Sequence, residues 1–203
     1  MLFRSLTGGE HRPRPLILEG GAVETDGAGS LLATRSTIMN GNRNHAFGQT
    51  DIERLLHEFL GFDRFLWLDH GEISGDDTDG HIDTLARFAG PDTILHATAP
   101  PGDEDHAGLA AMADQLGSFR TREGNPYRLV PLPFAGVHRD QDGRRLPATY
   151  ANFLITNSSV LLPVYGIDAD EEAVQILRDL FPERTVKPVD CRSIIERNGS
   201  LHC

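Results

Sequence analysis

The stretch that decides the fold is Tyr150-Ala151-Asn152-Phe153-Leu154-Ile155, followed by Val160-Leu161-Leu162-Pro163-Val164. Both runs are rich in apolar residues and are separated by Asn157-Ser158-Ser159, so we expect a hairpin. Apolar residues then recur at helical spacing over 169–180, after a capping-box pattern, and 185–189 is typical of a strand. The stretch therefore predicts one unit of hairpin, helix and strand.

The same order of elements recurs twice upstream. In the first repeat, 22–27 and 30–34 favour a hairpin, 51–60 a helix that starts with Thr50 and Glu53 as a capping box, and 65–68 a strand. The second repeat has its predicted hairpin at 81–88 and 93–97, its helix at 105–116 and its strand at 128–132. Three such units predict an α/β fold with a repeat architecture.

Composition narrows the function classes. Among 203 residues, 39% are hydrophobic and 24% are charged, which is ordinary for a soluble globular protein. The net charge of -11 argues against a nucleic acid or an anionic membrane as partner, and it is compatible with a cationic small substrate. Two cysteines make no disulfide scaffold, and residues 1–5 do not start a signal peptide. We expect a cytoplasmic protein.

Cys203, His81 and Asp83 are the candidate catalytic residues. A cysteine with a distant histidine and carboxylate is how thiol nucleophiles read in sequence. If 81–88 is a strand, His81 and Asp83 face the same side, and Gly80 lets the backbone approach a ligand. The alternative is that a cysteine near a chain end is inert and that, among nine histidines, one beside an aspartate is unsurprising. In a papain-like protease the cysteine precedes the histidine, and here the order is reversed.

Three further polar positions interrupt predicted elements. Glu19-Gly20-Gly21 suits a ligand-facing strand end, because glycines permit tight turns and close approach; the alternative is an ordinary β-turn. Asn152 lies in an apolar run, where a buried amide needs partners, and the alternative is that it bonds neighbouring backbone. We expect 40–44, which contains Arg43, to be a polar loop that braces the site.

Taken together, these motifs resemble the agmatine deiminase and Porphyromonas-type peptidylarginine deiminase family. They are Glu19-Gly20-Gly21, Asn42-Arg43-Asn44, the run from Asp76 to Asp83, Tyr150 to Phe153 and Gly199 to Cys203. The resemblance spans about 15–203. It implies an α/β propeller of ββαβ modules, of which about three of five are present. Residues 1–203 would then be a partial catalytic domain that lacks N-terminal modules and the segment after the nucleophile.

The resemblance also implies an activity: hydrolysis of a guanidino group to a ureido group and ammonia through an amidino-cysteine, with no metal or organic cofactor. Cys203 would be the nucleophile, His81 the acid/base and Asp83 the guanidinium-binding carboxylate. The resemblance implies lesser, substrate-binding roles for Glu19, Asp79, Gly80 and Asn152. The expected substrate is agmatine, which would yield N-carbamoylputrescine for putrescine biosynthesis; peptidyl- or free arginine and a non-catalytic, binding propeller are the alternatives.

The chain departs from the family pattern at a motif that supplies a substrate clamp. The Trp-x-Arg-Asp-x-Gly-Pro motif, whose aspartate is a second guanidinium clamp, does not occur, and Trp67 is the only tryptophan. A propeller without all its modules would have open strand edges, which favour self-association. We therefore expect the isolated chain to be inactive or nearly so, and a possible homo-oligomer.

Overall fold

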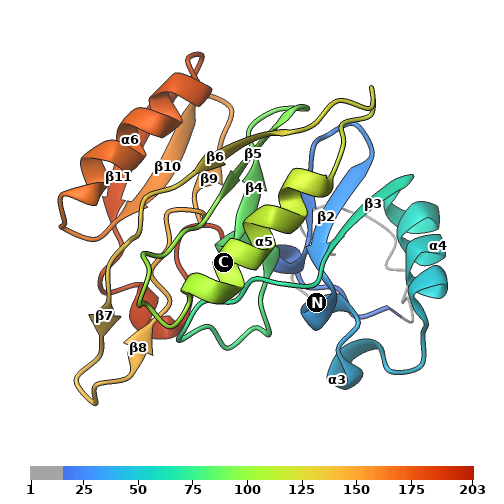
Figure 1. The fold of residues 1–203 in the computed structure, drawn as a ribbon, viewed down its shortest axis with the longest axis horizontal. Helices are drawn as coiled ribbons and strands as arrows, with labels where there is room; N and C mark the ends of the chain where they lie inside the picture. The colour runs from blue at the N-terminus through green and yellow to red at the C-terminus, as the bar shows by residue number, and fades with distance from the viewer. Residues whose placement is uncertain (1–15) are drawn as a thin grey trace, which may run out of the picture.

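The computed structural model describes residues 16–203, and the predicted absence of a signal peptide falls outside these residues. Three small sheets share one topology, in which an antiparallel pair of strands is followed by a helix and a strand parallel to the second of the pair. Figure 1 shows the three long helices, α6, α5 and α4 from left to right, each beside its own sheet. The fold is thus mixed α/β, as predicted.

The first unit forms because one helix face and one strand face are apolar. Leu31 packs with Ile52 and Leu56 of the helix, whereas Leu32, which faces the other way, joins the core of the second unit. The helix ends at Gly61, whose left-handed φ of 78° closes it. The unit consists of β1 (Glu24–Thr25), β2 (Ser30–Thr34), α2 (Arg35–Ile38), α3 (Gly41–Asn44), α4 (Gln49–Leu60) and β3 (Arg64–Leu68).

The second and third units repeat this packing with their own helices. Met112 and Leu116 bury one helix against Ile94, and Leu177 buries the other against Leu162. The second unit contains β4 (Ala86–Phe88), β5 (Thr93–His96), α5 (His106–Ser118) and β6 (Arg128–Pro131). The third contains β9 (Leu154–Ile155), β10 (Ser159–Val164), α6 (Ala169–Leu180) and β11 (Thr185–Asp190), and the connection between them carries β7 (His138–Arg139) and β8 (Arg145–Leu146).

A buried ion pair joins the three units. Arg87 of β4 donates from Nε to Oε2 of Glu24 at 2.7 Å and from Nη1 to the carbonyl oxygen of Phe153 at 2.8 Å. Both charged side chains are almost fully buried. Removing one partner would leave the other charged and buried, which is costly. The pair therefore fixes β1, β4 and the segment before β9 relative to one another.

The structure corrects several expectations about local conformation. The three long helices are confirmed, but neither predicted capping box forms. The first helix begins one residue before Thr50, and Asp168 makes no side-chain cap. Asp170 instead accepts backbone N–H groups from Tyr165, Gly166 and Ile167, which orders the turn before α6.

The predicted strands are shorter than expected wherever a candidate site residue lies. Residues 82–84 form a 3-10 turn (η2, Ile82–Thr84), so strand alternation was the wrong reason to place His81 and Asp83 together. Glu19 precedes a second 3-10 turn (η1, Gly20–Ala22) and does not end a strand. Asn152 lies two residues before β9. Irregular backbone, not regular strands, carries these side chains.

Candidate functional site

A tight turn over 76–80 delivers His81 to the site. The Asp76 carboxylate accepts hydrogen bonds from Oγ1 of Thr78 at 2.7 Å and from the N–H of Gly80 at 2.9 Å. Asp79 and Gly80 both have left-handed φ angles, 64° and 84°, which a tight reversal requires. The His81 N–H then donates to Oγ1 of Thr78. The turn fixes the backbone of His81 before its side chain makes any contact.

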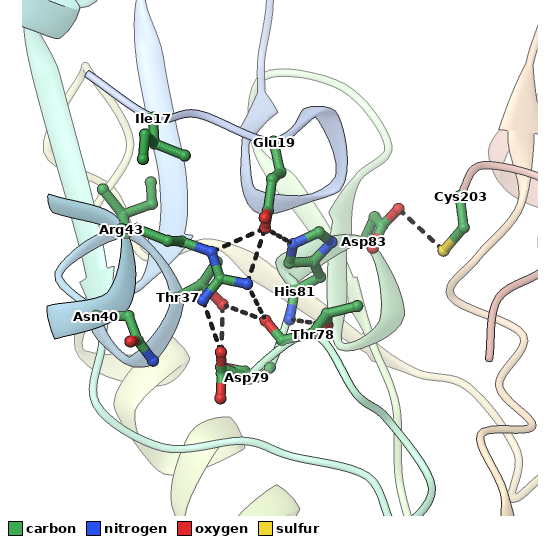
Figure 2. Close-up of polar contacts among 12 residues, drawn as sticks. Ile17, Glu19, Thr37, Asn40, Arg43, Thr78, Asp79, His81, Asp83 and Cys203 are labelled. Carbon is green, nitrogen blue, oxygen red and sulfur yellow. Dashed lines mark hydrogen bonds and ion pairs between the residues drawn. The ribbon is translucent and has the colours of Figure 1, made fainter. Parts of the chain in front are cut away.

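Glu19 and His81 form a close acid–imidazole pair. Nε2 of His81 lies 2.5 Å from Oε2 of Glu19, and Figure 2 shows the carboxylate between His81 and Arg43. Hydrogen bonds from Arg43 and His81 hold the pKa of Glu19 below its usual value. Because an ionised carboxylate only accepts, Nε2 of His81 carries the proton in this contact. Nδ1 is left as the ring nitrogen that can exchange a proton.

Gly21 leaves room for the two groups beside it. A Cβ at this position would lie 2.6 Å from Nδ1 of His81 and 2.8 Å from Oδ2 of Asp83, closer than real contacts allow. A Cβ on Gly20 would meet nothing within 4 Å. The second glycine is therefore required by the close approach of imidazole and carboxylate, and the segment is not merely an ordinary β-turn.

Asp83 is a buried carboxylate with one free oxygen. Its side chain is fully buried, and Oδ1 has no hydrogen-bond partner. Oδ2 accepts from Nδ1 of His202 at 2.8 Å and from the thiol of Cys203 at 3.6 Å. A buried oxygen without a partner is costly unless a donor arrives from outside the chain. Asp83 is thus poised to bind a ligand that donates hydrogen bonds.

Cys203 faces this carboxylate (Figure 2). Burial of the sulfur and, after it, the negative charge of Asp83 raise the pKa of the Cys203 thiol to about 11. The sulfur is therefore a thiol at neutral pH. A cation bound at Asp83 would offset the charge that opposes ionisation and would favour the thiolate.

Asn152 ties the last residues of the chain to the site. Its Oδ1 accepts from the Ser200 hydroxyl at 3.0 Å and from the N–H of His202 at 3.1 Å. Its Nδ2 donates to Sγ of Cys203 at 3.1 Å and to the Asp83 carbonyl at 3.3 Å. The amide is buried and bonds distant groups, not neighbouring backbone.

The structure brings together five of the seven sequence-predicted residues: Glu19, His81, Asp83, Asn152 and Cys203. Asp79 and Gly80 belong to the turn that holds His81: the Asp79 side chain points to Arg43, and the space a Gly80 Cβ would fill adjoins Ser36 and Gly71. Sequence reasoning did not single out His202 or the fork that Arg43 makes. His202 could have been predicted from its position next to Cys203 in the sequence.

The described residues hold no group of three or more His, Cys, Asp or Glu arranged to bind a metal ion. Within the same part of the chain, no helix has the length and apolar character needed to cross a bilayer.

Fold and site together define a mixed α/β protein in which a cysteine thiol, an imidazole and two carboxylates converge from distant segments. The chain belongs to the Porphyromonas-type peptidyl-arginine deiminase family, whose model matches residues 2–203.

Relatives of known name agree with this assignment. A Pectobacterium atrosepticum protein called "Putative agmatine deiminase" is 32% identical over 93% of this chain and 56% of its own length. Among solved structures, the "Putative Arginine Deiminase from Porphyromonas gingivalis" is 50% identical with a TM-score of 0.90, over 93% of this chain and 56% of that one. A substrate-bound agmatine deiminase variant of C. jejuni is 36% identical with a TM-score of 0.90, over 99% and 59%. The chain thus spans little more than half the length of these relatives.

Proposed function

We propose that this chain carries the reaction centre of a hydrolase that converts the guanidino group of agmatine to a ureido group and ammonia, giving N-carbamoylputrescine. The observation that carries the proposal is Asp83, fully buried with an unpartnered Oδ1, beside the thiol of Cys203. A guanidinium is a planar cation with N–H donors, the chemistry that such an oxygen accepts. Relatives named agmatine deiminase support the choice of substrate.

Asp83 first binds the substrate cation and thereby activates the nucleophile. The guanidinium donates to Oδ1 and places its carbon near Sγ of Cys203. The positive charge of the guanidinium offsets the negative charge of Asp83. The pKa of the Cys203 thiol therefore falls from about 11. The thiol proton passes to Nδ1 of His81, the nitrogen that does not contact Glu19. Glu19 stabilises the imidazolium that results.

The covalent step forms a C–S bond and breaks a C–N bond. The Cys203 thiolate attacks the guanidinium carbon, and His81 returns its proton to the departing nitrogen, which leaves with the electron pair as ammonia. An amidino-cysteine remains. Water then gives a proton to His81 and attacks the same carbon. The C–S pair returns to sulfur, which takes the proton from His81 to restore the thiol, and the added oxygen loses its remaining proton to solvent as the ureido product leaves.

The fold suits this assignment if the three units are consecutive ββαβ modules of an α/β propeller around a central site. Their identical strand order supports the proposal. The site residues come from the segments that lead into the first unit (Glu19), the second (His81, Asp83) and the third (Asn152), and from the segment that follows the third (Cys203). We accordingly treat residues 1–203 as part of one catalytic domain.

Arginine, free or within a peptide, is the second candidate substrate. The structure with 50% identity carries the name arginine deiminase, and the family is named for peptidyl-arginine. Both candidates present the same guanidinium to Asp83, so the contacts described above do not distinguish them. The part of the substrate beyond the guanidinium must therefore determine which of the two candidates the protein accepts.

A single-turnover experiment tests the proposal even though we expect repeated turnover by the isolated chain to be nearly absent, because it requires only the first covalent step. The chain is mixed with agmatine, quenched in acid and analysed by intact mass and ammonia assay. We expect an adduct of agmatine less one ammonia on Cys203, one ammonia per adduct, and neither in Cys203→Ser. Parallel reactions with arginine and an arginyl peptide rank the substrates. Absence of any adduct from all three would overturn the proposed function.

A further inference from the structure

Arg43 makes a three-way fork inside the site (Figure 2). Its Nε lies 3.0 Å from Oε2 of Glu19, and its Nη2 lies 3.0 Å from the same oxygen. Nη1 donates to Oδ2 of Asp79 at 2.6 Å, and Nη2 donates to the carbonyl oxygen of Thr78 at 3.2 Å. One side chain thus holds both the carboxylate that contacts His81 and the turn that carries His81.

The oxygen that Arg43 grips is the one that His81 uses. Oε2 of Glu19 accepts from the guanidinium and from Nε2 of His81, which lies 2.5 Å away. The Glu19 side chain is 40% exposed, so it would be free to rotate into solvent without a second anchor. Arg43 itself is only 14% exposed. The guanidinium therefore sets the rotamer of Glu19 and keeps it ionised beside the imidazole.

The base of Arg43 is fixed relative to Glu19 by its neighbour. Asn44 is buried; its Oδ1 accepts from the N–H of Ile17, and its Nδ2 donates to the Ile17 carbonyl oxygen at 2.9 Å. The Asn40 side chain accepts from the N–H of Asn42 and so starts α3. Residues 41–44 are thus a one-turn helix capped by Asn40, not the polar loop expected over 40–44. The helix and the segment before Glu19 are bound together by paired amide hydrogen bonds.

We infer that Arg43 is a positioning residue for the acid/base chemistry of His81, acting through Glu19. It holds Glu19 ionised and within hydrogen-bonding distance of Nε2, which keeps the proton on Nε2 and leaves Nδ1 for proton exchange. A lysine would supply one charge, but not donors in three fixed directions toward Glu19, Asp79 and Thr78. The inference deepens the proposed function and rests on it for the role of His81.

The first test measures positioning without any turnover. The chain is labelled at glutamate carboxyl carbons and at arginine and histidine nitrogens, and NMR spectra are followed through the titration of Glu19, assigned with Glu19→Gln. In the wild-type chain, the Arg43 Nε–H signal and the His81 ring signals must shift at the pH at which Glu19 titrates. If Glu19 titrates while the Arg43 Nε–H signal stays constant, the inference is wrong.

Variants sharpen the same measurement. In Arg43→Met we expect the Glu19 titration midpoint to move to higher pH and the His81 Nε2 hydrogen-bond signature to weaken. Arg35→Met is the matched control, because it removes a 2.8 Å ion pair with Asp69 from the neighbouring α2 and leaves Glu19 untouched. An unchanged Glu19 midpoint in folded Arg43→Met would contradict the inference. Should this variant not fold, the wild-type titration still decides.

A double-mutant cycle separates positioning from general destabilisation. Arg43→Met should slow adduct formation with agmatine about tenfold in the wild-type background and scarcely at all when Glu19 is already glutamine. An equal loss in both backgrounds would show that Arg43 does not act through Glu19. If the wild-type chain forms no adduct, the proposed function fails, while the titrations still test the contact between Arg43 and Glu19 independently of turnover.

Discussion

Substituting Asp83 by asparagine should change the reactivity of Cys203 toward two matched probes in opposite directions. Chloroacetamide is neutral, and chloroacetamidine is its cationic counterpart of nearly the same shape. The pKa of the Cys203 thiol is raised to about 11, chiefly by burial and next by the negative charge of Asp83. Removing a like charge at a thiol–oxygen separation of 3.6 Å should lower that pKa by about one unit. The thiolate fraction at neutral pH, and with it the rate of labelling by chloroacetamide, then rises about tenfold.

For the cationic probe, the same variant removes the attraction of the Asp83 charge, and this loss is larger than the gain from the more abundant thiolate. A unit charge about 4 Å from a carboxylate is stabilised by about 4 kcal/mol at an effective dielectric constant of about 20, so the loss of this attraction outweighs the tenfold gain in thiolate. We expect the rate of labelling by chloroacetamidine to fall at least about tenfold. The ratio of the chloroacetamidine rate to the chloroacetamide rate should then fall about 100-fold. In the wild-type chain, chloroacetamide labelling should keep rising with pH and level off only above a pKa of about 11.

The assay is a time course of peptide-mapped alkylation. Asp77→Asn is the control, since it removes the same charge from an exposed carboxylate whose partner is Asn198. The reasoning is refuted if both probes slow, or both accelerate, in Asp83→Asn, because Asp83 would then act through the fold and not through its charge.

Contacts in and around the site give three further predictions. Gly21→Ala should slow adduct formation with agmatine more than about tenfold because its Cβ displaces the imidazole and the carboxylate, whereas Gly20→Ala should match the wild-type chain. His202→Asn, which retains a donor toward the buried carboxylate, should keep the preference for chloroacetamidine over chloroacetamide, and His202→Leu should reduce it; equal loss in both would argue against the hydrogen bond. Arg87→Met should lower the free energy of unfolding in urea by about 3–5 kcal/mol, while Arg192→Met, which removes an exposed pair, should stay within about 0.5 kcal/mol.

Local periodicity sufficed to predict the three long helices and most of the strands. Leu177 and its apolar neighbours mark α6 because one helix face packs on one sheet, which is a property of spacing alone. The caps were not predictable in the same way. Asp170 is saturated by backbone N–H groups of the preceding turn, and such competition among nearby carboxylates is decided by backbone geometry.

The residue types at the site were predictable, but their connections were not. His81 and Asp83 were expected on one strand, yet a 3-10 turn carries Asp83, and His81 pairs with Glu19 across 62 positions. Contacts at that separation depend on how the units pack, which no short-range pattern encodes. Likewise, Asn152 was recognised as a buried amide in need of partners, and only the fold shows that it holds Cys203.

Protection of Cys203 tests most directly whether a guanidinium occupies the space between Asp83, His81 and the thiol. The chain is alkylated with chloroacetamidine in the presence of agmatine or of putrescine, a diamine without the guanidino group. The account predicts that agmatine slows labelling of Cys203 in a saturable manner, that putrescine does not, and that Asp83→Asn abolishes the difference. Equal protection by the two amines, or none by agmatine, would contradict the account.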